Sequence, residues 1–256
     1  MPYLKRIVKA GNTIEVKKYF TSRFGKKDKD SRNAKASVTS EKMKKVNEEI
    51  AVEKLRWLIN ENFCAGDIHM VLTYDDDHLP ETEGAKEAIR KYMRKLRKVY
   101  KEQNKELKYI KTAEYEGKRI HHHVLVNKFD TQILDELWEC GHVYFRILDN
   151  TGDYSKLASY FVKETSKTYT EGLISGKRWD ASKNLRKPSI TKVVVSADSW
   201  TKNPVAIKGY YIPSDSIEMD VDCFGYPYQK YTMIKIPEKK GIRNGKYRSY
   251  NGAAYG

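Results

Sequence analysis

The stretch that decides the fold is LKYIKTAEYEGKRIHHHVLVN, residues 107–127. β-branched and aromatic residues fill its two halves, and the dipeptide Gly117-Lys118 separates them. This pattern is typical of two antiparallel strands joined by a tight turn. We therefore predict a β-hairpin with strands at 107–115 and 119–127.

The turn sets which residues of this hairpin face each other. With glycine first, as a type II′ turn requires, Glu114 lies opposite His121 and Thr112 lies opposite His123. Alternate residues of a strand share a face, so His121 and His123 point one way and His122 points the other. Glu114, His121 and His123 are therefore predicted to cluster on one face of the sheet.

Two imidazoles and a carboxylate on one sheet face are a ligand set for a catalytic divalent cation. A site with positions left open for water and phosphate suits Mg²⁺ or Mn²⁺. Mn²⁺ should bind more tightly, whereas Mg²⁺ would act through its abundance. Three alternatives stay open: histidines that lie on a surface strand by chance, an ordinary zinc site, and a register in which His122 is the ligand.

Helices and strands alternate outward from the hairpin. Apolar periodicity predicts strands at 68–74 and 142–148, and helices at about 40–62, 80–104, 131–140 and 153–165. The resulting order, β-α-β-β-α-β-α, indicates an α+β fold in which one antiparallel, ferredoxin-like sheet is backed by helices. Beyond residue 175 we expect three strands, at 190–196, 205–212 and 230–236.

These patterns divide the chain into three expected parts. Residues 1–62 form a basic arm and helix that add a DNA contact, and residues 63–175 form the core. Residues 176–256 form a β-rich extension that packs on the core and ends in a basic tail.

The charge of the chain favours a polyanionic partner. The formal net charge is +15, and residues 1–60 hold 16 Lys and Arg against 7 Asp and Glu. Basic arms bind nucleic acid by releasing counterions from phosphates, and nineteen tyrosines offer stacking surfaces for unpaired bases. Lys26, Lys27 and Arg32 in the polar stretch 21–40 are candidate DNA contacts. The alternative is that the charge serves solubility alone.

Other classes of protein are disfavoured by what the sequence lacks. No apolar run approaches the roughly 18 residues of a membrane span, and the N-terminal residues lack the apolar core of a signal peptide. The three cysteines show no CxxC pairing, which favours a reducing cytoplasm. No GxxxxGK[ST] phosphate loop is present, so unwinding would need another protein.

The helix predicted at 153–165 carries a candidate nucleophile. Lys156, Tyr160 and Lys163 share one side of it at helical spacing. A phenol attacks poorly at neutral pH unless a cation stabilises its oxyanion, and we expect Lys163 to do so. The alternative is ordinary packing with lysine stems along the surface. Tyr154 is the candidate for a second nucleophile, but six residues turn a helix by about 240°, so it would face away.

LTY (72–74), RIHHHVLVN (119–127) and YFVK (160–163), in this order, resemble the motifs of the HUH endonucleases. The chain is most similar to replication initiators related to the gene II proteins of filamentous phages and to those of small bacterial mobile elements. The likeness extends to LRWLINENF (55–63), RWDASKNLRKP (178–188) and YPYQKYTMIKI (226–236). It departs from the family pattern at His122, where an aliphatic residue is usual.

The resemblance implies a rolling-circle replication initiator that nicks and rejoins single-stranded DNA through one tyrosine. It implies that His121, His123 and Glu114 hold Mg²⁺ or Mn²⁺, that Tyr160 cuts the strand and that Lys163 assists. Lys156 and Arg119 are expected to contact DNA. The expected partners are single-stranded DNA at an origin, possibly in a hairpin, and a host helicase and polymerase.

Three other functions stay open at this stage. One is a transposase or relaxase of the same superfamily, although relaxases usually have three histidine ligands and an N-terminal tyrosine. The second is a basic nucleic-acid-binding protein without activity. The third is a hydrolytic nuclease that forms no covalent intermediate.

Overall fold

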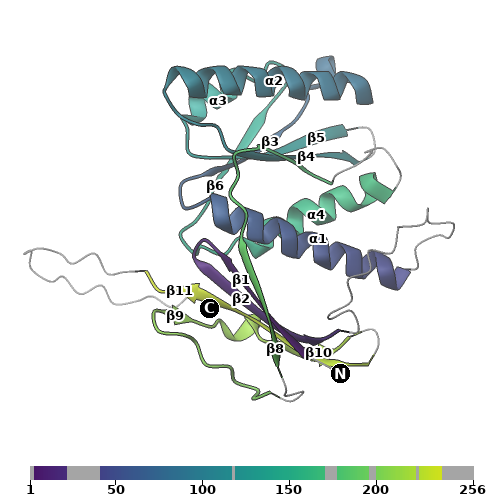
Figure 1. The fold of residues 1–256 in the computed structure, drawn as a ribbon. Helices are drawn as coiled ribbons and strands as arrows, with labels where there is room; N and C mark the ends of the chain where they lie inside the picture. The colour runs from purple at the N-terminus through teal and green to yellow at the C-terminus, as the bar shows by residue number, and fades with distance from the viewer. Residues whose placement is uncertain are drawn as a thin grey trace, which may run out of the picture.

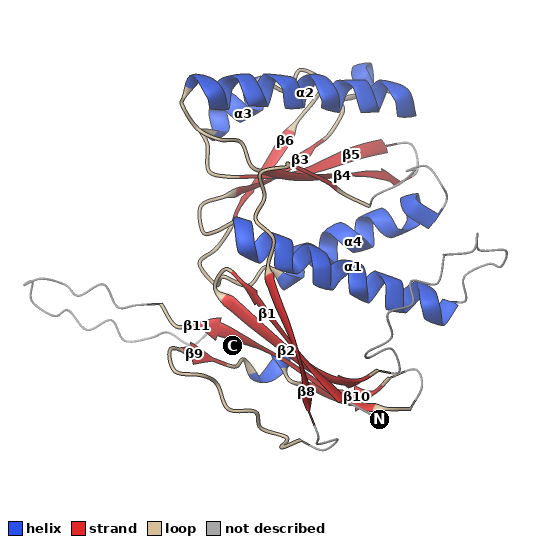
Figure 2. Cartoon of the chain, in the orientation of Figure 1, coloured by secondary structure: helices blue, strands red, loops and turns tan. Residues whose placement is uncertain are grey.

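A computed structural model describes residues 3–21, 41–116, 119–170, 178–195, 200–222 and 225–237. Helices and antiparallel sheets alternate in four layers, helix, sheet, helix and sheet (Figures 1 and 2). The predicted α+β class is confirmed. Among the described residues, no helix is long and apolar enough to cross a bilayer.

The hairpin forms the middle of the sheet that carries the candidate site. This sheet has the order β6 (Val143–Ile147), β3 (Ile68–Leu72), β5 (Arg119–Val126), β4 (Tyr109–Glu116) and β7 (Asp180–Ala181), and every pair is antiparallel. Glu114 pairs with His121 and Thr112 pairs with His123, as the sequence predicted, while the predicted turn at Gly117-Lys118 lies outside the described residues.

Helices cover both faces of this sheet. On one face, α2 (Thr82–Glu102) and α3 (Thr131–Glu136) bury the side chains of alternate residues such as Met70 and Val124. On the other face, α1 (Glu41–Asn62) and α4 (Ser155–Thr170) pack over Leu125. Because the odd-numbered residues of β5 face α4, the face that holds His121 and His123 is the face that α4 covers. The short 3₁₀ turn η1 (Asp76–His78) follows β3.

The β-rich extension predicted beyond residue 175 is confirmed, and its three predicted strands belong to a second sheet. β10 (Glu218–Val221), β11 (Pro227–Lys235), β2 (Thr13–Phe20), β1 (Tyr3–Ala10) and β8 (Ser189–Val195) form it in that order. β9 (Tyr210–Tyr211) pairs with β11, and η2 (Ser214–Ser216) precedes β10. The N-terminal segment expected as an arm begins with a hairpin that joins the C-terminal strands. Of the strand expected at 205–212, only Tyr210–Tyr211 is a strand.

The turn between β1 and β2 lies directly against α1. Gly11 has a φ of +53°, and a Cβ atom there would lie 1.9 Å from the carbonyl oxygen of Asn60. No side chain fits at that distance, so glycine is required both by the left-handed backbone and by the close approach.

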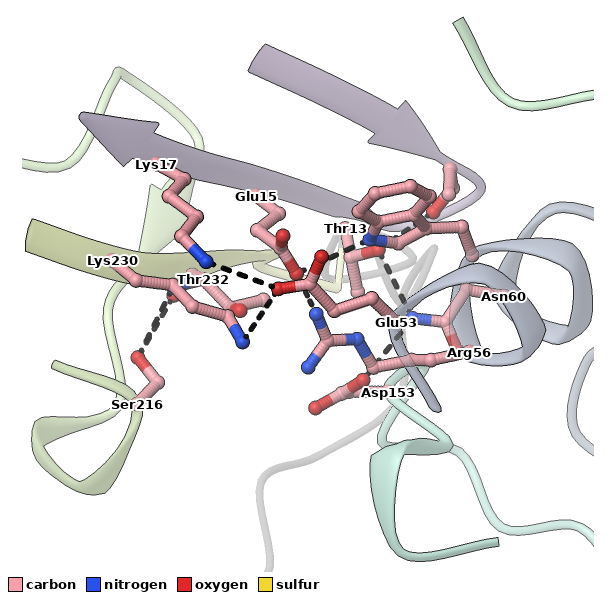
Figure 3. A network of polar contacts seen from close by, with 12 residues as sticks. Thr13, Glu15, Lys17, Glu53, Arg56, Asn60, Asp153, Ser216, Lys230 and Thr232 are labelled. Carbon is pink, nitrogen blue, oxygen red and sulfur yellow. Dashed lines mark hydrogen bonds and ion pairs between the residues drawn. The ribbon is translucent and has the colours of Figure 1, made fainter. Parts of the chain in front are cut away.

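A buried ionic network fixes α1 to the second sheet (Figure 3). The Glu53 carboxylate of α1 lies 2.9 Å from Arg6 Nη2, 3.1 Å from Lys230 Nζ and 3.8 Å from Lys17 Nζ. Glu15 of β2, also buried, pairs with Arg6 and with Arg56 of α1. Arg6 lies on β1 and Lys230 on β11, so this network ties residues from both ends of the chain to one helix.

Candidate active site

The three residues predicted to cluster do lie together. Glu114 Oε2 is 3.3 Å from His123 Nε2 and 3.8 Å from His121 Nδ1. The His123 side chain is 1% exposed and that of His121 is 35% exposed, so the cluster runs from the interior to an open rim. An approaching ligand would therefore meet His121 first.

His122 belongs to the opposite face. Its Nε2 lies 2.8 Å from the Tyr74 hydroxyl, and its ring packs edge-on against Trp138. Burial lowers the pKa of His122 to about 3, so the ring is neutral. Because it faces the α2 layer, His122 cannot share a ligand with Glu114, which removes the alternative register.

Tyr160 lies against the same cluster. Its ring centroid is 5.2 Å from that of His123 in an edge-to-face contact, yet the residue is 40% exposed. Burial, Glu164 and Glu114 raise the pKa of Tyr160, while Arg146 lowers it, and the net shift is upward. The phenol is therefore protonated at neutral pH until a further positive charge or a proton acceptor reaches it.

His69, on β3, completes the group and was missed from the sequence. It is 4% exposed, and its ring stacks 5.6 Å from His123 and lies 6.1 Å from Tyr160. Burial first, and then His123 and Arg146, lower the pKa of His69 to about 3. The alternation of β3 could have revealed it. Ile68 and Met70 point into the core under α2, so His69 between them points to the opposite face, where His121 and His123 lie.

Lys163 does not lie with Tyr160. It lines a cleft of about 420 Å³ beside α1, together with Lys45, Arg56 and Lys230. Arg146 of β6, and not Lys163, is the cation whose charge lowers the pKa of Tyr160. The structure therefore does not place Lys163 where the expected stabilisation of the oxyanion would need it.

The other predicted residues fall outside the cluster. Lys156 is exposed in the first turn of α4. Tyr154 is 6% exposed, its hydroxyl donates to the Asp149 carbonyl at 3.0 Å, and burial and Asp149 raise its pKa to about 12. Arg119 begins β5, where its backbone pairs with Glu116.

The predicted contacts Lys26, Lys27 and Arg32 lie outside the described residues.

The donor types fit a divalent cation, although the side chains are not arranged around one. Within the described ranges, no three His, Cys, Asp or Glu side chains already have the arrangement of a metal site. His123 Nδ1 and both ring nitrogens of His69 are buried without a hydrogen-bond partner there. Unsatisfied nitrogens beside a carboxylate are costly, and a bound cation with its water ligands would satisfy them.

The family model described as replication-associated protein ORF2/G2P matches residues 67–169. The match runs from just before β3 into α4, and so contains His69, the hairpin, Arg146 and Tyr160. It confirms the resemblance to gene II-type replication proteins that the sequence motifs predicted. No curated protein and no solved structure matches the chain.

Proposed function

Because residues 67–169 match the model of the replication-associated protein ORF2/G2P family, we propose that this protein initiates rolling-circle replication by nicking and rejoining single-stranded DNA. The observation that carries the proposal is the contact between Tyr160 and His123, at 5.2 Å between ring centroids on the face that also holds Glu114 and His121. A half-exposed phenol beside a group of metal-ligand types is the arrangement that tyrosine transfer chemistry needs.

The proposed step is a transesterification. Tyr160 Oη attacks the scissile phosphorus and loses its proton, and the bond from phosphorus to the 3′ oxygen breaks. The leaving 3′ oxygen takes up a proton and becomes a free 3′-OH for a host polymerase. A 5′-phosphotyrosine bond remains, and a later 3′-OH can attack it to restore the strand without ATP.

Each residue of the cluster has a separate proposed role. His121, His123 and Glu114 would hold Mg²⁺ or Mn²⁺, which when bound supplies Lewis-acid polarisation of the scissile phosphate. The buried ring of His123, packed edge-on, orients the Tyr160 ring toward that phosphate. Lys156 and Lys163, exposed on α4, are proposed to contact the DNA backbone rather than the phenol.

The test is a denaturant-resistant adduct. The protein is incubated with Mn²⁺ and a pool of labelled random-sequence single-stranded oligonucleotides, without ATP, and separated on a denaturing gel. Wild type and the Tyr211→Phe control, whose tyrosine lies in the second sheet, should both form the adduct. Tyr160→Phe should not, yet should bind the same pool within a few-fold.

Two results would contradict the proposal. An adduct that persists in Tyr160→Phe would assign the nucleophile to another residue. A wild-type protein that binds the pool but forms no adduct would be a non-catalytic binding protein, or a hydrolytic nuclease if shortened products appear.

A further inference from the structure

The edge strand β6 presents two side chains to the candidate active site that no step above uses. Among the strands that the structure describes, β6 is an outer strand of its sheet and pairs with β3 alone. Arg146 pairs with His69, and Tyr144 pairs with Val71, which in turn pairs with His123. Arg146 and Tyr144 therefore share the face of the histidines and of Tyr160, one behind the other along the strand.

Arg146 is placed to meet a phosphate beside the phenol. Its guanidinium is near enough to act electrostatically on both Tyr160 and His69. The residue is exposed, and in the described part of the chain it makes no ion pair with a carboxylate. An unneutralised guanidinium offers a planar fork of donors that matches two phosphate oxygens.

Tyr144 is placed to meet a base. It is 62% exposed and presents its ring to solvent, whereas Val143 and Phe145 on either side of it pack against the core under α2. It also borders a cleft of about 230 Å³ that His121, His142 and Tyr74 line. Two residues along a strand span about 6.6 Å, a step comparable to one nucleotide of an extended single strand.

We propose that β6 forms the binding site for the DNA strand at the cleavage point. Arg146 binds a backbone phosphate next to Tyr160, and Tyr144 stacks on a neighbouring base. The inference rests on the proposed function, since it names the contacts that would present single-stranded DNA to Tyr160. Stacking on Tyr144 needs a base that is free of its own helical stack, so this surface would favour unpaired DNA.

The experiment measures binding apart from cleavage. Tyr160→Phe serves as the background, and the probe is a fluorescein-labelled dT oligonucleotide in EDTA, titrated by anisotropy from 50 to 300 mM NaCl. Arg146→Ala should bind roughly ten-fold more weakly at the lowest salt. The slope of log K against log salt should become shallower by about 0.7, the value of one phosphate contact on a single strand.

Tyr144→Ala should behave differently. It should lose about 5- to 150-fold in affinity with the slope unchanged, because stacking releases no counterions. Arg146→Lys keeps the charge and should restore the slope. The matched controls are Arg90→Ala, an exposed arginine of α2, and Tyr211→Ala, an exposed tyrosine of β9, and both should bind like the background protein.

The outcomes separate the two proposals. If Arg146→Ala and Tyr144→Ala match their controls in affinity and in salt dependence, β6 is not the DNA-binding site, whether or not wild type forms the adduct. If both variants bind weakly as expected but wild type forms no adduct, the DNA-binding site on β6 is supported and the proposed attack by Tyr160 is refuted. A thermal melt of each variant identifies any loss of affinity that arises from unfolding. A variant that is unfolded at the assay temperature is replaced by Arg146→Gln or Tyr144→Leu.

Discussion

Replacement of Glu53 by glutamine tests the ionic network that fixes α1 to the second sheet. The Glu53 side chain is 9% exposed and faces three cations, Arg6, Lys17 and Lys230. Burial alone would raise the pKa of this carboxyl, but Lys230, Arg6 and Lys17 together outweigh it, and the pKa lies below its ordinary value of 4.5. In Glu53→Gln the three cations would stay in place without their shared anion.

The magnitude follows from the burial of the partners. Loss of one member of a buried ion pair costs about 3–5 kcal/mol. Here the cations are 17–29% exposed, and Arg6 keeps Glu15 at 3.1 Å, so water and the second carboxylate offset part of the loss. We expect the free energy of unfolding to fall by about 2–4 kcal/mol, which shifts the urea midpoint by on the order of 1 M.

Urea unfolding followed by tryptophan fluorescence measures this difference at several pH values. A group with a depressed folded-state pKa contributes stability above its unfolded pKa and loses it as the pH falls through the folded pKa. The difference between wild type and Glu53→Gln should therefore be complete at pH 7 and shrink below about pH 4.5.

The matched control is Glu87→Gln on α2, where Glu87 pairs with Arg90 and Arg94 in solvent. It should change the unfolding free energy by less than about 0.5 kcal/mol. The reasoning fails if Glu53→Gln costs no more than this control at pH 7, or if its cost is the same at pH 3.5 as at pH 7.

Four further predictions concern the candidate active site and the residues that pack around it. His121→Ala and His123→Ala should each weaken Mn²⁺ binding at least ten-fold in calorimetry, and wild-type affinity in either would remove that residue from the ligand set. His122→Phe should lower the unfolding free energy by about 1–3 kcal/mol, because the buried hydrogen bond between His122 and the Tyr74 hydroxyl is lost, while Mn²⁺ affinity stays within two-fold. Gly141→Ala should cost more than about 2 kcal/mol in thermal melts, because a Cβ there would lie 2.4 Å from the Thr73 carbonyl oxygen at a φ of +153°. Tyr154→Phe should cost about 0.5–1.5 kcal/mol and still form the covalent DNA adduct, and loss of the adduct in a folded protein would show that Tyr154 is required for the attack.

The core sheet could be predicted because its signals are local. The Gly117-Lys118 dipeptide in the sequence predicted the register of the hairpin, and the two-residue periodicity of β5 predicted the faces of His121, His122 and His123. The second sheet could not be predicted in this way. β1 and β2 carry lysine and arginine among their apolar residues, and the carboxylate of Glu53, far along the chain, pairs with two of them, Arg6 and Lys17.

The neighbours of Tyr160 depend on strand order and helix phase. Arg146 and His69 meet only because β6 and β3 are adjacent, and strand order is not encoded within either strand. Seen along the axis of α4, Lys163 lies about 60° to one side of Tyr160, and Glu164 lies about 40° to the other side. That angle places Lys163 on the flank toward α1, whereas Tyr160 and Glu164 lie on the flank toward the histidines.

The pairing of β2 with both β1 and β11 has a consequence for synthesis on the ribosome. β2 ends at residue 20 and β11 ends at residue 235. At about 5–20 residues per second, the last strand leaves roughly 10–40 s after the first hairpin is made. Until then the polar groups along the open side of β2 are exposed, so the nascent chain offers an unprotected strand edge to aggregation or chaperones, although residues 67–169, which match the family model, have already been synthesised.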